Sequence, residues 1–115
     1  MRNILSRKIG IGCTSEENID IVREELIKNL NVDRYSRECI VTKNGDYIRF
    51  FQLENENVRG RRFREVYIEE GYDNMDFINT CVRPMLVDNP YNIYKLDIDD
   101  AAGSIIEPRR FVVSS

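Results

Sequence analysis

The stretch from residue 9 to residue 30 constrains the fold most, because it has the pattern of a strand that leads directly into an amphipathic helix. Apolar residues alternate with glycines from Ile9 to Cys13, which predicts a short strand whose glycine face lets a helix approach closely. Thr14 and Glu17 have the spacing of a capping box. From about Ser15 to Leu30, apolar residues recur every three or four positions, as on one face of a helix.

The rest of the chain alternates short apolar runs with polar turns and contains one further helical pattern. Asn44-Gly45 is a strong hairpin signal, since both residues tolerate positive φ. Apolar residues from Phe77 to Met85 share one helical face, and Pro84 should kink or end that helix. We expect a loop over residues 101–104 and a last extended segment over residues 105–113. The other expected strands are Cys39–Thr42, Tyr47–Leu53, Phe63–Ile68 and Ile93–Ile98.

Helices between strands require crossover connections, so much of the sheet should be parallel. The sequence therefore predicts a single α/β domain over residues 1–115. It should hold a small mixed sheet with parallel core strands, one antiparallel hairpin and two main helices. The strand that begins at Ile93 should lie at an open edge, and exposed edges invite pairing. We expect the tail, within residues 101–115, to cover that edge in cis or by exchange within a homodimer.

The composition argues against several kinds of site and partner. A net charge of -3 gives no global basic field that would attract nucleic acid. Cys13, Cys39 and Cys81 are isolated, and the chain has no histidine, so a zinc site is not expected. Their odd number and apolar surroundings indicate reduced, buried thiols in a cytoplasmic protein. No run has the length of a signal peptide or a membrane span, so no membrane partner is expected.

Charged groups are most concentrated between Val58 and Gly71, where an arginine-rich loop precedes the buried strand. Four arginines within six residues exceed what solubility requires. They favour contact with a phosphate backbone or with an acidic protein surface. The alternative is a solvated loop whose charge is balanced by nearby glutamates. The candidate binding residues are Arg59, Arg61, Arg62 and Arg64, with Arg109 and Arg110 as a second cluster.

Glu69 and Glu70, which end this strand, are the candidate catalytic residues if the protein is an enzyme. Ligands of open α/β sheets sit at the carboxyl ends of the strands, where two carboxylates can hold a cation or polarise a water. Asp97 could join them, because adjacent parallel strands end at the same edge. Mg²⁺ is the metal that such a set would hold. The alternative is a solvated acidic turn with no catalytic residue and no cofactor.

Together these motifs resemble the Walker B region of the phage large terminase subunits, the DNA-packaging ATPases. An asparagine-glycine hairpin, an arginine-glycine pair and a hydrophobic strand ending in two acids follow one another there, as Asn44-Gly45, Arg59-Gly60 and Val66–Glu70 do here. The resemblance covers roughly residues 8–97 and implies half of a P-loop ATPase-like core. It places Glu69 at the acid that contacts Mg²⁺ through water. It places Glu70 at the carboxylate that activates the attacking water.

The chain departs from that family because it has no GxxxxGK[ST] loop, which supplies the amides and the lysine that cradle phosphates. We therefore expect a non-enzymatic binding protein of a phage or other mobile element. It would act on a host or phage protein, or on nucleic acid, for example to inhibit a host defence such as CRISPR. Its location would then be the host cytoplasm. The alternative is an enzyme, either a metal-dependent nuclease or an ATPase half that a partner chain completes.

Overall fold

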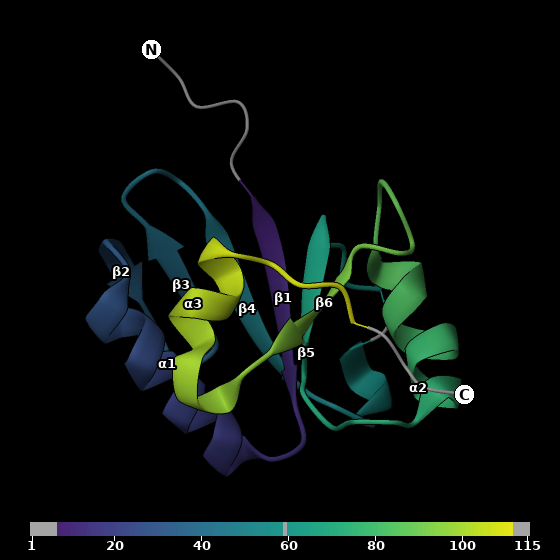
Figure 1. Ribbon diagram of the computed structural model, residues 1–115. Helices are drawn as coiled ribbons and strands as arrows, with labels where there is room; N and C mark the ends of the chain where they lie inside the picture. Colours follow the sequence, from purple (N-terminus) through teal and green to yellow (C-terminus); the bar gives the residue numbers. More distant parts are fainter. Residues whose placement is uncertain (1–6, 59, 112–115) are drawn as a thin grey trace.

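The computed structural model describes residues 7–58 and 60–111, which form a six-stranded mixed sheet in the order β2-β3-β4-β1-β5-β6 (Figure 1). β4, β1, β5 and β6 run parallel, whereas β3 pairs antiparallel with both β2 and β4. The expected α/β fold with a parallel core and an antiparallel hairpin is confirmed. The strands are β1 (Lys8–Cys13), β2 (Val32–Tyr35), β3 (Cys39–Thr42), β4 (Tyr47–Gln52), β5 (Glu65–Glu69) and β6 (Ile93–Leu96).

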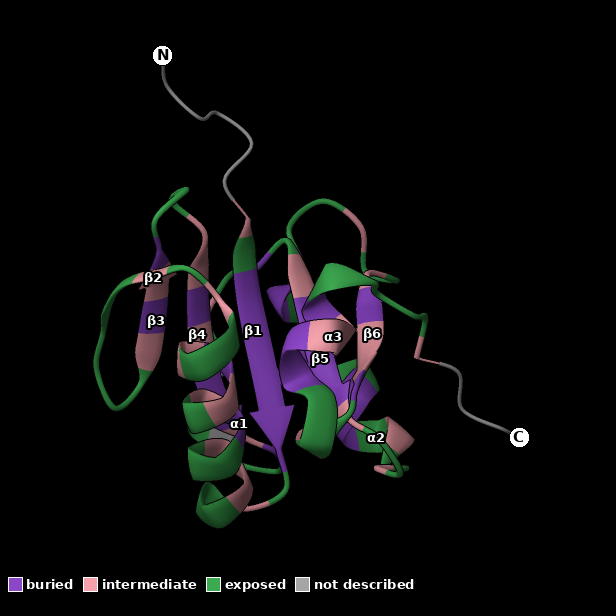
Figure 2. Cartoon of the chain, turned by 60° about the vertical axis from the view of Figure 1, so that its left-hand side comes forward, coloured by how far each residue is buried: buried purple, intermediate pink, exposed green. Residues whose placement is uncertain are grey.

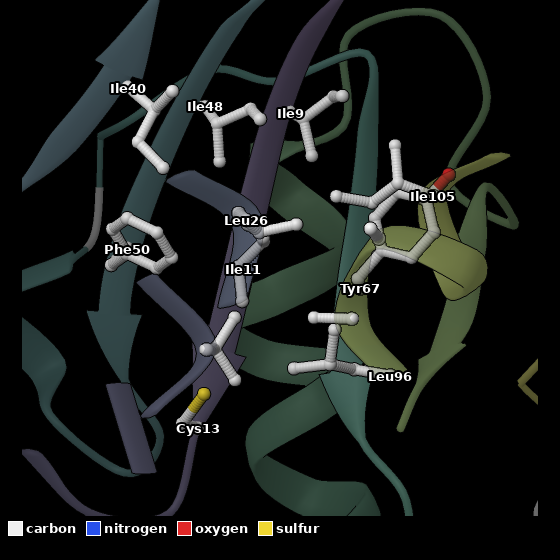
Figure 3. Close-up of a cluster of buried hydrophobic side chains, with 13 residues drawn as sticks. Ile9, Ile11, Cys13, Leu26, Ile40, Ile48, Phe50, Tyr67, Leu96 and Ile105 are labelled. Carbon is white, nitrogen blue, oxygen red and sulfur yellow. The ribbon is translucent and has the colours of Figure 1, made fainter. Parts of the chain in front are cut away.

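One face of the sheet is covered by α1 (Glu16–Asn29) and α3 (Ala101–Ile106), with a 3-10 turn, η4 (Ile98–Asp100), leading into α3. Figure 3 shows Leu26 of α1 and Ile105 of α3 among buried side chains from β1, β3, β4, β5 and β6. This face explains the helical periodicity of α1, because Val22 and Leu26 are its buried residues.

The opposite face is covered in part, by η1 (Glu56–Val58) and by one irregular helical stretch near β5 and β6. That stretch consists of α2 (Met75–Phe77), a π-helical segment η2 (Ile78–Val82) and a 3-10 turn η3 (Arg83–Met85). Pro84 falls in the 3-10 turn, where the stretch ends, as expected from its missing N–H. Because both faces of β1 are covered, its residues from Ile9 to Cys13 are all buried (Figure 2).

The two glycines of β1 make room for side chains rather than for a helix, so that expectation was wrong. A Cβ atom at Gly10 would lie 2.8 Å from the ring of Phe63. A Cβ atom at Gly12 would lie 2.9 Å from Phe51 and from Leu53. Phe51 belongs to β4, whereas Leu53 and Phe63 belong to the segment that crosses the sheet between β4 and β5. The glycines therefore allow this crossing to pack tightly on the central strand.

Several local predictions differ from the structure. The cap of α1 is Ser15, whose hydroxyl accepts from the Asn18 amide at 3.1 Å, rather than Thr14. β2 was not predicted at all. Residues 101–106 form α3 instead of a loop and the start of an extended segment. α3 forms because Asp100 caps it and because the Glu25 carboxylate accepts a hydrogen bond from the Ala102 amide at 2.9 Å.

The chain after α3 runs along the outer edge of β6. The carbonyl of Arg109 accepts from the amide of Lys95 at 2.8 Å, and the amide of Phe111 donates to the carbonyl of Ile93 at 2.9 Å. Arg110 thereby forms an antiparallel bridge with Tyr94. At these residues the edge of the sheet is covered by the same chain.

The connection that follows β1 and the connection that follows β5 run in opposite directions across the sheet. This reversal creates a topological switch point between β1 and β5. The chain passes from β1 through α1 on one face to β2, β3 and β4, and from β5 to β6 through α2, η2 and η3 on the other. In doubly wound sheets, ligands bind outside the carboxyl ends of the strands at such a point. Thr14 and Glu69 lie there.

Candidate functional site

The switch point is filled by the carboxylate of Glu69. It accepts hydrogen bonds from the Thr14 amide at 2.9 Å, from the Thr14 hydroxyl at 3.0 Å and from the Asn18 side chain at 3.0 Å. A helix N-terminus with free backbone amides attracts phosphates and other anions. Here the chain supplies its own anion at the start of α1. A bound phosphate would have to displace this carboxylate or approach it against like-charge repulsion.

The neighbouring thiol is inert. Cys13 is fully buried at the end of β1, and burial together with the charge of Glu69 raises the pKa of its thiol from 9.0 to about 12. A thiol that stays protonated at neutral pH is a poor nucleophile. Cys13 therefore belongs to the core, as expected.

Glu70 lies apart from Glu69, because successive residues of a strand point to opposite faces. Its backbone amide donates to the Leu96 carbonyl at 2.9 Å, and its exposed side chain lines a cavity of about 240 Å³. Asp97 and Arg109 line the same cavity. Asp97 also accepts a hydrogen bond from the Asp99 amide at 3.0 Å, which makes it the cap of η4.

The three acids proposed for Mg²⁺ are thus used differently. Glu69 holds the start of α1, and the exposed Asp97 caps a turn. Glu70 is exposed too, and its carboxylate makes no hydrogen bond to the described residues. Across residues 7–58 and 60–111, no three acidic, cysteine or histidine side chains are grouped in a way that could hold a metal ion.

A second carboxylate, that of Glu54 in the loop after β4, is also used in internal hydrogen bonds. Glu54 adopts φ 71, which is unusual for a residue with a side chain, and accepts hydrogen bonds at 3.1 Å from Tyr72 and at 3.1 Å from Asn74. Burial and the bond to Glu54 raise the pKa of the Tyr72 hydroxyl. Beside this contact lies a cavity of about 570 Å³, lined in part by Thr14 and Gln52.

The arginines that are clustered in the sequence, Arg61, Arg62 and Arg64, do not share one surface in the structure. Phe63 is buried and pairs with Leu86, so Arg62 and Arg64 on either side of it point outward along the segment after η3. Arg62 donates to the Pro84 carbonyl at 3.2 Å, and Arg64 pairs with Asp88 at 3.5 Å. Arg59 lies outside the described residues.

The second predicted arginine cluster supplies one residue to this same region. Arg110 donates to the Tyr91 carbonyl at 2.5 Å, and its guanidinium lies 5.5 Å from the centre of the Tyr94 ring. Arg83, which sequence reasoning missed, donates to the Pro90 carbonyl at 2.7 Å and stacks 5.1 Å from the Tyr91 ring.

Residues from three distant parts of the chain therefore meet around the loop that follows η3. We call this region the arginine–tyrosine surface. Two large apolar side chains of the same loop are also exposed, Val87 by 52% and Tyr91 by 65%. The arginine–tyrosine surface consists of Arg62, Arg64, Arg83, Tyr91 and Arg110.

Arg61 and Arg109 lie elsewhere. Arg109 faces the cavity that holds Glu70 and Asp97. Arg61 faces the region of β4, where burial and the charge of Arg49 lower the pKa of its guanidinium. Neighbouring arginines in the sequence are thus divided among separate surfaces.

In the part of the chain that the structure describes, no helix combines the length and the apolar character needed to cross a membrane. Comparison of this chain with models of protein families, with curated proteins and with solved structures found no match.

Proposed function

We propose that this chain is a non-enzymatic binding protein that holds an acidic protein partner through the arginine–tyrosine surface. The observation that carries the proposal is the convergence of Arg62, Arg64, Arg83 and Arg110 on one loop beside the exposed ring of Tyr91. Arginine and tyrosine dominate the residues whose truncation weakens protein–protein interfaces most.

The geometry of these arginines supports binding. Arg62, Arg83 and Arg110 each use one N–H group to hold a backbone carbonyl, which orients the guanidinium before a partner arrives. An oriented side chain loses less conformational entropy on binding. Arg83 also donates its Nε–H to Asn79 at 2.7 Å. The N–H groups that remain can take carboxylates. Asp88 is the acid that the structure pairs with this set, at 3.5 Å from Arg64.

The switch point also supports a non-enzymatic role, because it lacks the groups that would hold a nucleotide. Glu69 is bound to Thr14 and Asn18, and the chain has no phosphate-cradling loop. The resemblance to the terminase ATPase core supports a phage or mobile-element setting on a degenerate ATPase scaffold. The partner would then be a host or phage protein, for example an enzyme of a host defence such as CRISPR.

The experiment is quantitative co-purification of the tagged protein from infected cells. The Arg62→Ala/Arg64→Ala variant should lose the protein that the wild type captures. The Lys28→Ala/Arg37→Ala variant removes the same charge from exposed sites elsewhere and should retain it. Equal capture by wild type and by the Arg62/Arg64 variant would remove the basis of the proposal.

The enzymatic alternative is tested in the same preparations. Glu70→Gln removes the exposed carboxylate that a nuclease or a completed ATPase half would need. Full biological activity of this variant excludes the enzyme, whereas its loss with partner capture intact would favour it.

A further inference from the structure

We infer that the protein has a second binding site, for single-stranded nucleic acid, on the uncovered face of β2, β3 and β4. This site is independent of the arginine–tyrosine surface. It rests on the strand register, on the charges that the register brings together and on one buried guanidinium N–H without a partner.

The face is uncovered because the helical stretch from α2 to η3 lies beside β5 and β6, away from β2 and β3 (Figure 1). Ile40 and Ile48 point toward α1 on the other side. Their neighbours along the strands therefore point to the uncovered face. The register places Arg34, Val41, Tyr47 and Lys8 in one row across four strands, and Cys39 beside Arg49 in the next row.

None of these side chains is fully buried, and several are cationic. Lys8 and Arg34 are exposed, and Arg49 keeps 33% of its side-chain surface exposed. Arg61 adds a further charge from the loop before β5, since its guanidinium interacts electrostatically with Arg49, Glu38 and Tyr47. The acids paired with this set are Glu38, at 3.3 Å from Arg49, and Asp33, at 3.3 Å from Arg34.

The pair formed by Arg49 and Arg61 lacks enough acceptors. Within the described residues, the Nε atom of Arg49 is buried without a hydrogen-bond partner. Glu38 accepts from Arg49 Nη2 at 3.3 Å and is also the acid whose charge acts on Arg61. An unpaired buried donor and two neighbouring like charges both raise the free energy of the empty site. An anion between the two guanidiniums relieves both, once the partly exposed Arg49 side chain turns toward it.

The arrangement of the other residues favours a nucleic-acid strand over a lone anion. Arg34 and Lys8 lie three strand spacings apart, roughly 14 Å, so the cations suit several charges of an extended polyanion. Tyr47 lies between them and presents an aromatic ring to this face. Binding of single strands commonly combines a basic groove with aromatic side chains on which bases stack. We define the sheet-face site as Lys8, Arg34, Tyr47, Arg49 and Arg61.

The test is fluorescence anisotropy of the purified protein with a labelled polythymidine of about 12 nucleotides, a typical length for such sites. Arg61→Ala should weaken binding severalfold and reduce the dependence of log K on log salt by about 0.7, the contribution of one phosphate of a single strand. Tyr47→Ala should weaken binding about tenfold, whereas Tyr47→Phe should bind as the wild type does.

The matched control is Lys28→Ala, which removes one positive charge from an exposed position of α1, the helix that covers the opposite face of the sheet. It should leave oligonucleotide affinity unchanged. Circular dichroism of each variant checks that it is folded, and Arg61 suits this test because it makes no side-chain hydrogen bond to the described residues.

Four results would each overturn the inference. The wild type could fail to bind the oligonucleotide. Lys28→Ala could weaken binding as much as Arg61→Ala does. A duplex of the same length could bind as tightly as the single strand, which would exclude stacking on Tyr47. Polyglutamate or inorganic phosphate could displace the oligonucleotide at equal charge concentration, which would assign the site to acidic proteins or to a lone anion.

Discussion

Glu69 accepts hydrogen bonds from both the backbone amide and the hydroxyl group of Thr14, at 2.9 Å and 3.0 Å. Thr14 follows β1 and Glu69 ends β5, so this contact closes the point of the sheet where doubly wound folds bind ligands. The chain thus places its own carboxylate where a phosphate would be held. This relationship supports a structural role for Glu69. The exposed arginines of the arginine–tyrosine surface are then the better candidates for contact with a partner.

Replacement of Glu69 with alanine should lower the free energy of unfolding by about 1 kcal/mol, because the Thr14 amide and the Asn18 side chain lose a charged acceptor. Urea unfolding measures this difference. Glu70→Ala is the matched control, since its exposed side chain makes no hydrogen bond to the described residues. Its effect should stay within about 0.5 kcal/mol. Equal losses in the two variants would show that the contact with Thr14 contributes nothing.

Gly10→Ala should destabilise the protein by about 1–3 kcal/mol, because the new methyl group would overpack the core. Its Cβ atom would lie 2.8 Å from the ring of Phe63, between β1 and the crossing segment. Phe63→Leu in the same chain should reduce that penalty. In a double-mutant cycle, the loss of unfolding free energy in Gly10→Ala/Phe63→Leu should therefore be smaller than the sum of the losses in the two single variants. Strict additivity would contradict the packing described here.

Stability should fall at alkaline pH, in part through Cys13. Its thiol has a pKa near 9.0 when exposed and about 12 when folded, so the folded state holds this proton more tightly. The stabilisation is complete below pH 9 and is lost as pH rises from 9 toward 12.

Cys13→Ala isolates this contribution. Burial also raises the pKa of the Tyr67 hydroxyl, so Tyr67 lowers stability at alkaline pH as well, but it does so in both proteins and cancels in their difference. The difference in unfolding free energy between wild type and Cys13→Ala should shrink as pH rises above 9. A difference that stays constant between pH 8 and about pH 11 would show that Cys13 ionises normally.

The sequence predicted the elements whose patterns are local. β1, β3, β4 and α1 have strong periodicity or a clear turn signal, and all four are present. β2 has two apolar residues, Val32 and the exposed Tyr35, and forms because it pairs with β3. α3 contains Gly103 and depends on Glu25, a residue far away in the chain. Such elements arise from tertiary contacts, which a local pattern does not encode.

The candidate site shows the same limit. The sequence indicated an arginine cluster, but the strand-like backbone around Phe63 sends Arg61 and Arg62 to different surfaces. Arg83 was missed because it lies alone before Pro84, and only folding brings it to Tyr91. The sequence shows how many charged residues lie close together along the chain. The strand register and the loops decide which of these residues share a surface.

The most direct measurement is the affinity of three purified proteins for the partner that the wild type captures, determined by titration calorimetry at low and high salt. The account predicts that Arg62→Ala/Arg64→Ala binds at least about tenfold more weakly than wild type and with less dependence on salt. It predicts that Glu69→Gln/Glu70→Gln, once shown to be folded, binds as the wild type does. Unchanged affinity in the arginine variant, with affinity lost in the acid variant, would contradict it.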